Sequence, residues 1–381
     1  MTRALLIAPQ WIGDAVMAQP LVALLAARGE RVTALALPGV AAVLRAMPGV
    51  VEVIEAPFAH GRLDLPLRLR LAAQVRGSGF DRAYVLGNTV KSRLVPWLAR
   101  IPRRIGHSGE ARGLLLTDVA TAVDANPLAE PLALSPLQCR IPRAPRVDMR
   151  RHYAALAAVA APAGTPQTLA EPVLAVTAAN AAAARARFDL PPRWIALCPG
   201  AEYGPAKQWP VAHFAALAVR AQQAGYAVAV LGAPRDAASG QAIAAQAPGV
   251  RNLCGATQLA DAIALLASSS GVVSNDSGLM HIAAALQRPT VGVYGSTDPR
   301  HTPPAAHRSA VVWLQLDCSP CFARTCPLGH LDCLRGISAG RVWDALAPLL
   351  ADAAGSVPEQ HRGDGAPAQS EIEHHERMDG L

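Results

Sequence analysis

Short apolar runs alternate with helix-like segments along most of the sequence. In the first half the apolar runs predict strands at residues 4–9, 31–37, 51–56, 81–86 and 103–107. The segments between them have the apolar spacing of helices, at residues 14–27, 38–47, 65–77 and 90–100. A strand, a helix and a second strand in succession form a βαβ unit, so this pattern predicts a parallel sheet with helices packed on its faces.

A second alternating series begins near residue 171, and no exact sequence repeat relates it to the first. Its predicted strands lie at residues 194–199, 226–232, 250–255, 271–275 and 290–295. Its predicted helices lie at residues 177–188, 211–225, 235–247, 258–268 and 277–287, with helices also expected at 147–160 and 340–352. A chain of 381 residues has room for two domains of ordinary size.

The fold class predicted is therefore α/β, with two doubly wound domains facing each other. The expected boundaries are 1–170 for the first domain and 171–353 for the second. The proline-rich stretch 123–148 is expected to be a surface loop, and the polar residues 354–381 to be a disordered tail.

The formal net charge of +7 suits an anionic partner, such as a nucleotide, a nucleic acid or an acidic membrane. Aromatic residues make up only 4% of the chain and do not alternate with basic residues, which argues against single-stranded nucleic acid. The N-terminus has the pattern of strand, loop and helix rather than of a signal peptide, and no stretch predicts a spanning helix. We therefore expect a cytoplasmic protein whose seven cysteines are thiols or metal ligands.

The stretch CPGAEYGPAKQWP, residues 198–210, follows a predicted strand and precedes a predicted helix. Backbone N–H groups in such a loop can hold phosphate, and Lys207 adds a positive charge. The stretch is not a Walker P-loop, because Gln208 follows the lysine where that motif requires Ser or Thr. The alternative is an ordinary turn with a solvated lysine.

A second polar junction, SNDSGLMH at residues 274–281, joins a predicted strand to a predicted helix in the same half. Gly278 would let a ligand approach the backbone closely, and His281 would share the first helical turn and could bond a diphosphate. The alternative is that Asp276 and Ser277 cap the helix and that His281 is packed. Two loops at strand ends of one doubly wound sheet favour a ligand site.

In the first half, Gly13 and Asp14 end the loop after the first strand. An acid at a helix start is commonly a cap. The functional alternative is a carboxylate that faces the other domain as a general base.

These motifs, WIGDAVM, CPGAEYGPAKQWP and NDSGLMHIAAAL, resemble those of the bacterial lipopolysaccharide heptosyltransferases, most closely heptosyltransferase II. The stretches HGRLDLPLRLRLA, DRAYVLGNTVKSRLVPW and RIGHSGEARGLLL extend the resemblance, which covers about residues 3 to 350. It implies a GT-B fold, with two Rossmann-like domains and an active site in the interdomain cleft. It also implies an inverting transfer of L-glycero-D-manno-heptose from ADP-heptose to heptosyl-Kdo-lipid A in inner-core synthesis, without a catalytic metal.

Carried onto this chain, the resemblance makes Asp14 the base that deprotonates the acceptor hydroxyl. Lys207 would be the second catalytic residue and would meet the diphosphate and the donor sugar. The first domain would bind the acceptor and the second would bind ADP-heptose. The remaining donor-site residues implied are Gly200, Ala201 and Glu202 in the phosphate loop, Asp276 for sugar hydroxyls, and Ser277, Gly278 and His281 for phosphate.

The nucleoside would lie against Thr257 at the adenine pocket and Asp236 at the ribose hydroxyls. Asn88, Lys91 and Arg93 are candidates for binding acceptor phosphate; the alternative for them is a solvated helix start. The enzyme would work at the cytoplasmic face of the inner membrane, where its lipid A-core acceptor lies, and would have no nucleic-acid partner.

The stretch CSPCFARTCPLGHLDC, residues 318–333, gathers four of the seven cysteines. Cys318 and Cys321 form a C-x2-C pair, and Cys326 and either Cys333 or His330 would complete a structural zinc site. The alternatives are ordinary thiols without a metal and, less favoured, an iron–sulfur centre. No cysteine of the cluster belongs to the donor motifs, so we expect catalysis to be independent of it.

Three other functions remain open at this stage. Heptosyltransferase I would add the first heptose, and a GT-B-fold nucleotide-sugar epimerase would turn over the sugar nucleotide without an acceptor. A basic nucleotide- or nucleic-acid-binding protein is disfavoured by Asp14, which would face an anionic ligand without a role.

Overall fold

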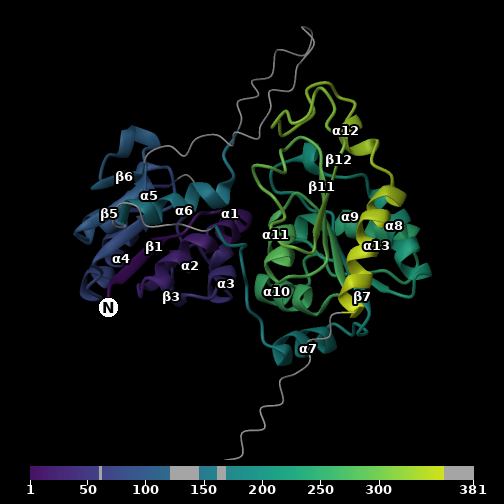
Figure 1. The fold of residues 1–381 in the computed structure, drawn as a ribbon, viewed down its shortest axis with the longest axis horizontal. Coiled ribbons are helices and arrows are strands. Elements are labelled where there is room, and N and C mark those ends of the chain that lie inside the picture. Colours follow the sequence, from purple (N-terminus) through teal and green to yellow (C-terminus); the bar gives the residue numbers. More distant parts are fainter. Residues whose placement is uncertain (60–61, 121–145, 161–168, 356–381) are drawn as a thin grey trace, which may run out of the picture.

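The computed structural model describes residues 1–59, 62–120, 146–160 and 169–355. The chain forms two halves, each a six-stranded parallel sheet with helices on both faces (Figure 1). The predicted α/β class with two doubly wound sheets is confirmed. The predicted loop at 123–148 and the predicted tail lie largely outside the described residues, and the last helix continues to Gly355.

The N-terminal sheet has the strand order β3-β2-β1-β4-β5-β6. Its strands are β1 (Arg3–Ile7), β2 (Arg31–Ala36), β3 (Val50–Glu55), β4 (Arg82–Val85), β5 (Arg103–His107) and β6 (Asp118–Ala120). Its helices are α1 (Ile12–Met17), α2 (Gln19–Ala27), α3 (Pro38–Arg45), α4 (Leu65–Gly77), α5 (Val90–Leu98) and α6 (Met149–Ala160). The chain reverses direction across the sheet between β1 and β4, which makes the carboxyl ends of these two strands the expected ligand site.

The C-terminal sheet has the order β12-β11-β10-β7-β8-β9, which repeats the order of the first sheet strand for strand. Its strands are β7 (Trp194–Cys198), β8 (Ala227–Val230), β9 (Arg251–Asn252), β10 (Gly271–Asn275), β11 (Thr290–Tyr294) and β12 (Ser309–Trp313). Its helices are α7 (Ala178–Arg187), α8 (Val211–Gln223), α9 (Ala237–Gln246), α10 (Leu259–Ser268), α11 (Gly278–Ala285), α12 (Asp332–Arg335) and α13 (Ala339–Gly355). The corresponding reversal lies between β7 and β10.

Alternating side chains of the central strands divide the interior into layers. Leu5 and Ile7 of β1 pack against α4 and α5, while Ala4 and Leu6 point to the opposite face. That opposite face belongs to a core cluster that continues through α1, α2 and α3 into α10, α11 and the second sheet. The two halves therefore share one apolar interior between the sheets, while α8, α9 and α13 cover the far side of the second sheet.

Four elements differ from the sequence prediction. The single helix expected at residues 14–27 is divided into α1 and α2 around Ala18, because Pro20 lacks the N–H needed inside a continuous helix. The edge strands β6 and β12 were not predicted, and neither was the short helix α12 within the cysteine stretch. Edge strands are half-exposed, so they lack the continuous apolar run that marks a central parallel strand.

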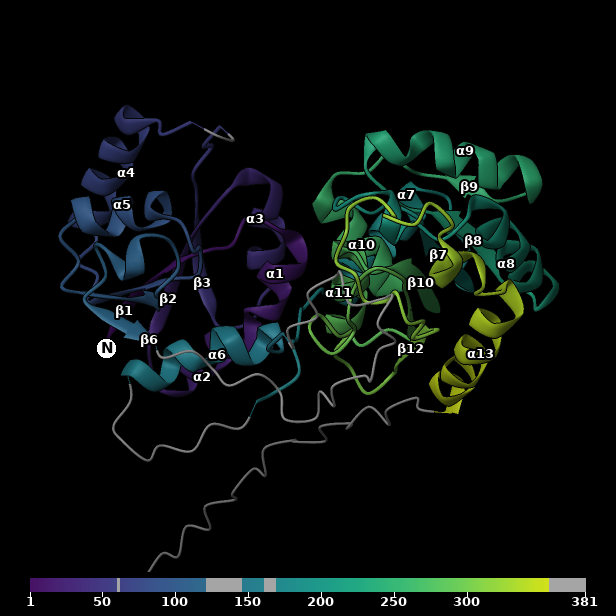
Figure 2. The ribbon, with the colours of Figure 1, turned by 90° about the horizontal axis from the view of Figure 1, so that it is seen from above.

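A short connection, residues 171–177, is hydrogen-bonded to both halves. The N–H groups of Val173 and Ala175 donate to the Gln19 side chain and the Ala46 carbonyl, and that of Leu174 donates to the Ala285 carbonyl. Next to this connection α1 contacts α11, and both helices lie between the two sheets (Figure 2). The first turns of both helices are thereby brought to one place.

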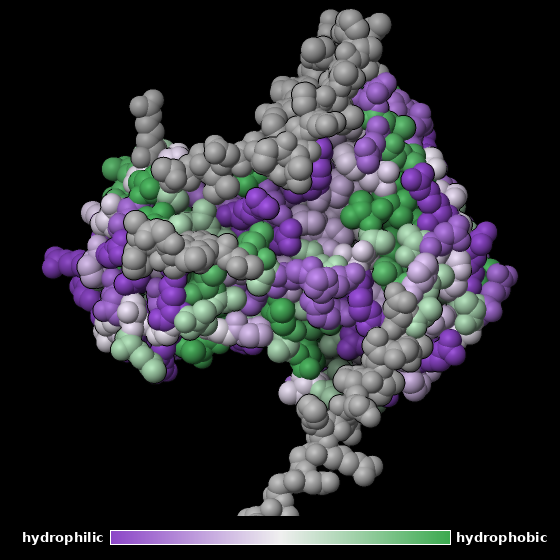
Figure 3. All heavy atoms as spheres, viewed as in Figure 1, coloured by the Kyte–Doolittle hydropathy of each residue, from purple (hydrophilic) through white to green (hydrophobic). Residues whose placement is uncertain are grey.

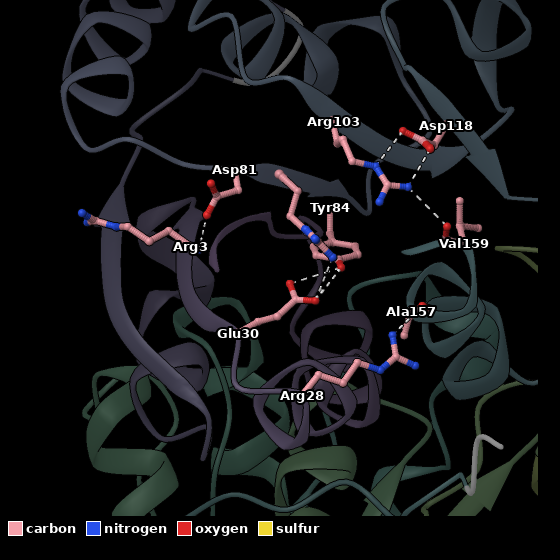
Figure 4. A network of polar contacts seen from close by, with 10 residues as sticks. Arg3, Arg28, Glu30, Asp81, Tyr84, Arg103, Asp118, Ala157 and Val159 are labelled. Atoms are coloured by element: carbon pink, nitrogen blue, oxygen red, sulfur yellow. Dashed lines mark hydrogen bonds and ion pairs between the residues drawn. The ribbon is translucent and has the colours of Figure 1, made fainter. Parts of the chain in front are cut away.

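At the amino ends of the strands of the first sheet, polar contacts join several neighbouring strands (Figure 4). Tyr84 donates to the buried Glu30 carboxylate at 3.2 Å, and Arg82 pairs with the same carboxylate at 3.1 Å. Burial raises the pKa of Glu30. Burial and the neighbouring Glu30 carboxylate together raise the pKa of Tyr84 to about 12. The network links the amino ends of neighbouring strands, away from their carboxyl ends.

The surface seen in Figure 3 carries small apolar patches set among hydrophilic side chains, without one continuous apolar face. Every helix in the described parts of the chain is too short or too polar to cross a bilayer.

Candidate active site

The two halves meet where the first turn of α1 faces the first turn of α11. A Cβ added at Gly278 would lie 2.7 Å from the Cβ of Ile12, and one added at Gly13 would lie 2.8 Å from Cδ2 of His281. Real Cβ atoms do not approach neighbours so closely, so these glycines permit the contact between the helices. The contact places Asp14 of the first half beside the polar groups of the second.

Asp276, directly after β10, is the centre of that polar group. Its side chain is 4% exposed, and its Oδ2 accepts hydrogen bonds of 2.6 Å from both Lys207 Nζ and Thr297 Oγ1. The Nε2 atom of His281 lies 3.7 Å from Oδ1. Burial alone would raise the pKa of Asp276, but the contacts with His281 and Lys207 hold it well below its usual range. The carboxylate is therefore ionised and fixes Lys207 in place.

Asp14 lies within the electrostatic reach of this group and has the opposite tendency. Burial raises its pKa above the ordinary aspartate value, while His281 and Lys207 lower it and Asp276 raises it. A half-buried carboxylate with a raised pKa at the junction of two domains has the properties of a general base.

The loop that carries Lys207 is held at both ends by one buried asparagine. Asn275 accepts from the Trp209 N–H at 3.0 Å and donates to the Pro199 carbonyl at 2.6 Å. Between these anchors the backbone passes over a 3-10 turn, Pro205–Lys207, so that the lysine returns toward β10. The sequence prediction missed Asn275 and also Thr297, although Thr297 follows β11 in the polar stretch GSTDP, where a ligand residue was to be expected.

The start of α11 has the features of an anion site, with one change from the expected capping. Ser277 occupies the N-cap position, but its hydroxyl bonds Ser274 at 3.0 Å and does not cap the helix. The first N–H groups of a helix attract anions when no side chain caps them. The capping role considered for Ser277 is therefore wrong, because Ser274 at the end of β10 competes for its hydroxyl.

The other predicted donor residues surround the loops after β7, β8 and β9. The Asp236 carboxylate is buried, accepts from the Ala233 N–H at 2.9 Å, and lies so close to Gly200 that a Cβ there would be 2.4 Å from its Oδ2. Ala201 is buried beside it, whereas Glu202 is exposed and pairs with Arg235. Thr257 is half-buried in the turn between β9 and α10.

The three predicted acceptor residues lie after β4, and they differ in exposure. Asn88 is exposed and Lys91 is half-buried at the start of α5. Arg93 is buried, and its terminal nitrogens donate to the carbonyls of residues 107, 108, 110 and 114. Arg93 thus holds the loop after β5.

The predicted cysteine cluster converges in space. Cys318, Cys321, Cys326 and Cys333 line one small cavity of about 10 Å³, together with His330. Burial and then the three other thiols raise the pKa of Cys333 to about 11. Within the described ranges, no three Cys, His, Asp or Glu side chains are already arranged as a set of metal ligands.

Comparison with known proteins decides the family. The sequence profile of glycosyltransferase family 9 (heptosyltransferase) matches residues 68–332. The chain belongs to glycosyltransferase family 9, the heptosyltransferases. It is 37% identical to lipopolysaccharide heptosyltransferase 2 of Salmonella typhimurium, over 92% of this chain and 99% of that protein. The predicted enzyme class is thereby confirmed.

Solved structures of this family have the same fold. The structure of E. coli ADP-heptose lps heptosyltransferase II matches with a TM-score of 0.76 and 34% identity, over 93% of this chain and 100% of that one. E. coli heptosyltransferase WaaC with ADP matches with a TM-score of 0.65 and 20% identity, over 91% and 100% of the two chains. The GT-B arrangement that the sequence resemblance implied is confirmed.

Proposed function

We propose that this heptosyltransferase moves L-glycero-D-manno-heptose from ADP-heptose to heptosyl-Kdo-lipid A, and so adds the second heptose of the lipopolysaccharide inner core. The observation that carries the proposal is the electrostatic interaction of Asp14 with the Lys207–Asp276–His281 group across the two halves, at the place where Gly13 packs against His281. It puts one candidate base opposite one candidate anion site. The choice of substrates is supported by the 37% identity with a lipopolysaccharide heptosyltransferase 2 along nearly the whole chain.

The C-terminal half, residues 171–353, binds the donor in this proposal. Lys207 and the first N–H groups of α11, with Ser277, Gly278 and His281, hold the diphosphate, and Asp276 bonds sugar hydroxyls while it orients Lys207. Gly200, Ala201 and Glu202 form the phosphate loop beside the ligand, and Asp236 and Thr257 border the nucleoside. Lys207 and the helix start then stabilise the charge that grows on ADP as it leaves.

The N-terminal half, residues 1–170, binds the acceptor. Asp14 takes the proton of the acceptor hydroxyl while the hydroxyl oxygen bonds to the anomeric carbon and the bond from that carbon to ADP breaks. Attack from the side opposite the leaving diphosphate inverts the anomeric centre. Asn88 and Lys91 are placed to meet acceptor phosphate, whereas Arg93 supports them by holding the loop after β5.

The enzyme acts in the cytoplasm, at the inner face of the membrane that holds its lipid acceptor. The segment that leads into α4 suits this position: Leu63, Leu65 and Leu69 are 47%, 45% and 49% exposed, and the exposed Arg62 and Arg70 lie among them. Interleaved leucines and arginines fit an anionic lipid surface. We assign no cofactor to the transfer step and a structural role to zinc at the cysteine cluster.

A transfer assay with two acceptors tests the function. The enzyme is incubated with ADP-heptose and either heptosyl-Kdo-lipid A or Kdo-lipid A, and the mass of the lipid is measured. We expect one heptose to be added to the first acceptor and the second to react poorly. Preference for Kdo-lipid A would identify a first heptosyltransferase, and conversion of ADP-heptose without either lipid would identify an epimerase.

A further inference from the structure

The cysteine stretch has a spatial arrangement that the transfer mechanism does not use. Cys318, Cys321, Cys326 and Cys333 line one cavity of about 10 Å³, and none of the four is in a disulfide. A cavity of that size has room for about one water molecule or one small ion. Apolar packing alone gives no reason to line one cavity with four thiols. Four thiolates that close around one cation form the common tetrahedral zinc site, although the four side chains are not already arranged as ligands.

The histidine beside the cavity is not available as a ligand. Nδ1 of His330 accepts a hydrogen bond of 2.9 Å from the N–H of Asp332, so in the neutral ring the proton is on Nε2. Neither ring nitrogen then has a lone pair for a metal. The ligand set that remains is the four cysteines, which settles the choice between Cys333 and His330 that the sequence left open.

The same stretch is bonded to the loop that carries Lys207. Tyr203 donates its hydroxyl hydrogen to the Phe322 carbonyl at 2.6 Å, and the Ala206 N–H donates to the Arg324 carbonyl at 3.0 Å. Gly204 approaches Arg324 so closely that a Cβ there would lie 2.5 Å from its carbonyl oxygen. Phe322 and Arg324 lie between Cys321 and Cys326, so the position of the phosphate loop depends on how these two cysteines are held.

A second set of bonds joins the stretch to the loop after β11. The Phe322 N–H donates to the Ser296 carbonyl at 2.7 Å, and the Ser319 hydroxyl donates to the Gly295 carbonyl at 2.5 Å. The next residue in that loop, Thr297, bonds Asp276. Lys207 and Thr297, which both donate to Oδ2 of Asp276, are therefore in loops that are hydrogen-bonded to the cysteine stretch.

We infer that Cys318, Cys321, Cys326 and Cys333 bind one zinc ion, and that the bound ion fixes the donor-phosphate loop through Phe322 and Arg324. The metal has no contact with substrate; it orders the loop that positions Lys207. The part of the inference that concerns ADP affinity rests on the proposed donor site. It also revises the expectation that catalysis is independent of the cluster, because the sequence did not reveal the contacts with Tyr203 and Ala206.

Metal content is the first test. Protein purified without a metal-affinity step, and then exposed to zinc chloride and desalted, is expected to hold about one zinc ion per chain by elemental analysis. Cys321→Ala and Cys326→Ala are each expected to lose the zinc, because each removes one ligand. Both side chains are part-exposed, so their removal should leave the core intact. Cys254→Ala, a buried cysteine outside the cluster, is the matched control and keeps the metal. Wild-type protein that holds no zinc after this treatment overturns the inference.

Hydrogen exchange is the second test, and it needs no substrate. Backbone amides of residues 203–207 are expected to exchange faster in the zinc-free Cys321→Ala protein than in the Cys254→Ala control, because the loop loses its fixed support. Tyr203→Phe is expected to keep zinc and to show a smaller increase. Unchanged exchange in a folded, zinc-free variant would disprove the support of the loop by the metal.

Calorimetry with ADP then separates the inference from the proposed function. We expect Cys321→Ala to bind ADP about tenfold more weakly than the control, a coupling of ordinary size. Faster loop exchange with unchanged ADP affinity would remove the loop from the donor site and contradict the proposed function, while leaving the zinc site in place. If the Cys321→Ala protein and the control had equal ADP affinity and equal hydrogen exchange, the inference that zinc supports the Lys207 loop would be wrong.

Discussion

The two sheets have the same strand order but opposite chemistry where their chains reverse. After the first strand of each sheet, the N-terminal half has a carboxylate, Asp14, and the C-terminal half has a positively charged side chain, Lys207. After the fourth strand, the N-terminal half has the exposed Asn88 and the C-terminal half the buried Asp276. The topology thus fixes where functional side chains lie, and the loops decide what charge is there.

The halves also differ in how far their polar groups are already bonded. Asn275 and Asp276 are 0% and 4% exposed and hold the phosphate loop and Lys207 before any ligand arrives. The N-terminal half has its buried arginine, Arg93, bonded to its own backbone, and Asn88 and Lys91 near the start of α5 are more accessible. In the proposed function, the small sugar nucleotide binds to the first arrangement and the large lipid-linked acceptor to the second.

The largest effect is expected from Asp14→Asn. Loss of the general base should lower transfer by about 10²–10⁴-fold, while ADP affinity measured by calorimetry stays close to that of the wild type. Asp81→Asn is the control, because that carboxylate bonds the Arg3 N–H at the opposite edge of the sheet. Near-normal transfer by the folded Asp14 variant would exclude it as the base and break the division of roles between the halves.

Lys207→Ala should have the next largest effect, on both binding and rate. A charge-assisted phosphate contact contributes about 1.5–3 kcal/mol, so ADP affinity should fall by roughly 10- to 150-fold. Lys91→Ala, in the acceptor half, should leave ADP affinity unchanged and raise the KM for the acceptor. If both variants weakened ADP binding equally, donor and acceptor sites would not be divided between the halves.

The pH dependence of transfer should report the pKa of Asp14. A base works only when deprotonated, and burial raises this pKa, so the rate should fall with decreasing pH at a higher pH than for an exposed aspartate. His281 lowers the pKa of Asp14, so His281→Gln should move the acid limb of kcat/KM to still higher pH. A shift of that limb to lower pH would contradict the coupling across the two halves.

The smallest effect on transfer is expected far from the site, at Tyr84. Tyr84→Phe removes a donor to the buried Glu30 carboxylate and should cost about 1–3 kcal/mol in the free energy of unfolding, with transfer unchanged. Glu30 has a raised pKa in the folded protein, and loss of the donor raises it further. The cost should therefore be full at neutral pH and shrink as Glu30 becomes protonated at lower pH.

Urea unfolding at two pH values measures this cost, with Tyr226→Phe as a control that leaves Glu30 untouched. Reduced transfer by a stable Tyr84 variant would show that the two edges of the sheet are coupled.

Central strands and the loops after them could be predicted from the sequence because a buried parallel strand is a continuous apolar run that ends in polar residues. β10 followed by Asp276 is the clearest example. The three-residue β6 has no such run, since one face of an edge strand meets solvent. The division of the first helix was visible in Pro20, but the strong apolar spacing around it favoured one long helix.

Partnerships between distant residues could not be predicted. The sequence shows Lys207 and Asp276 in separate motifs. Only the folded chain makes them an ion pair and brings Thr297 to donate to the same carboxylate oxygen of Asp276. Arg93 has the sequence surroundings of a phosphate ligand, yet its burial commits its guanidinium to backbone carbonyls. The bond between Tyr203 and Phe322 spans 119 residues and has no local signal.

The six-residue helix α1 has a consequence for how enzymes of this shape diversify. Its first turn is set by direct contact with α11, so the candidate base is positioned by the C-terminal half as much as by its own half. The residues proposed to meet the acceptor, Asn88 and Lys91, follow β4 and lie outside both of these helices. In the proposed function, new acceptor preferences can therefore arise by changes in the loop after β4, while the position of the candidate base relative to the donor site is inherited unchanged.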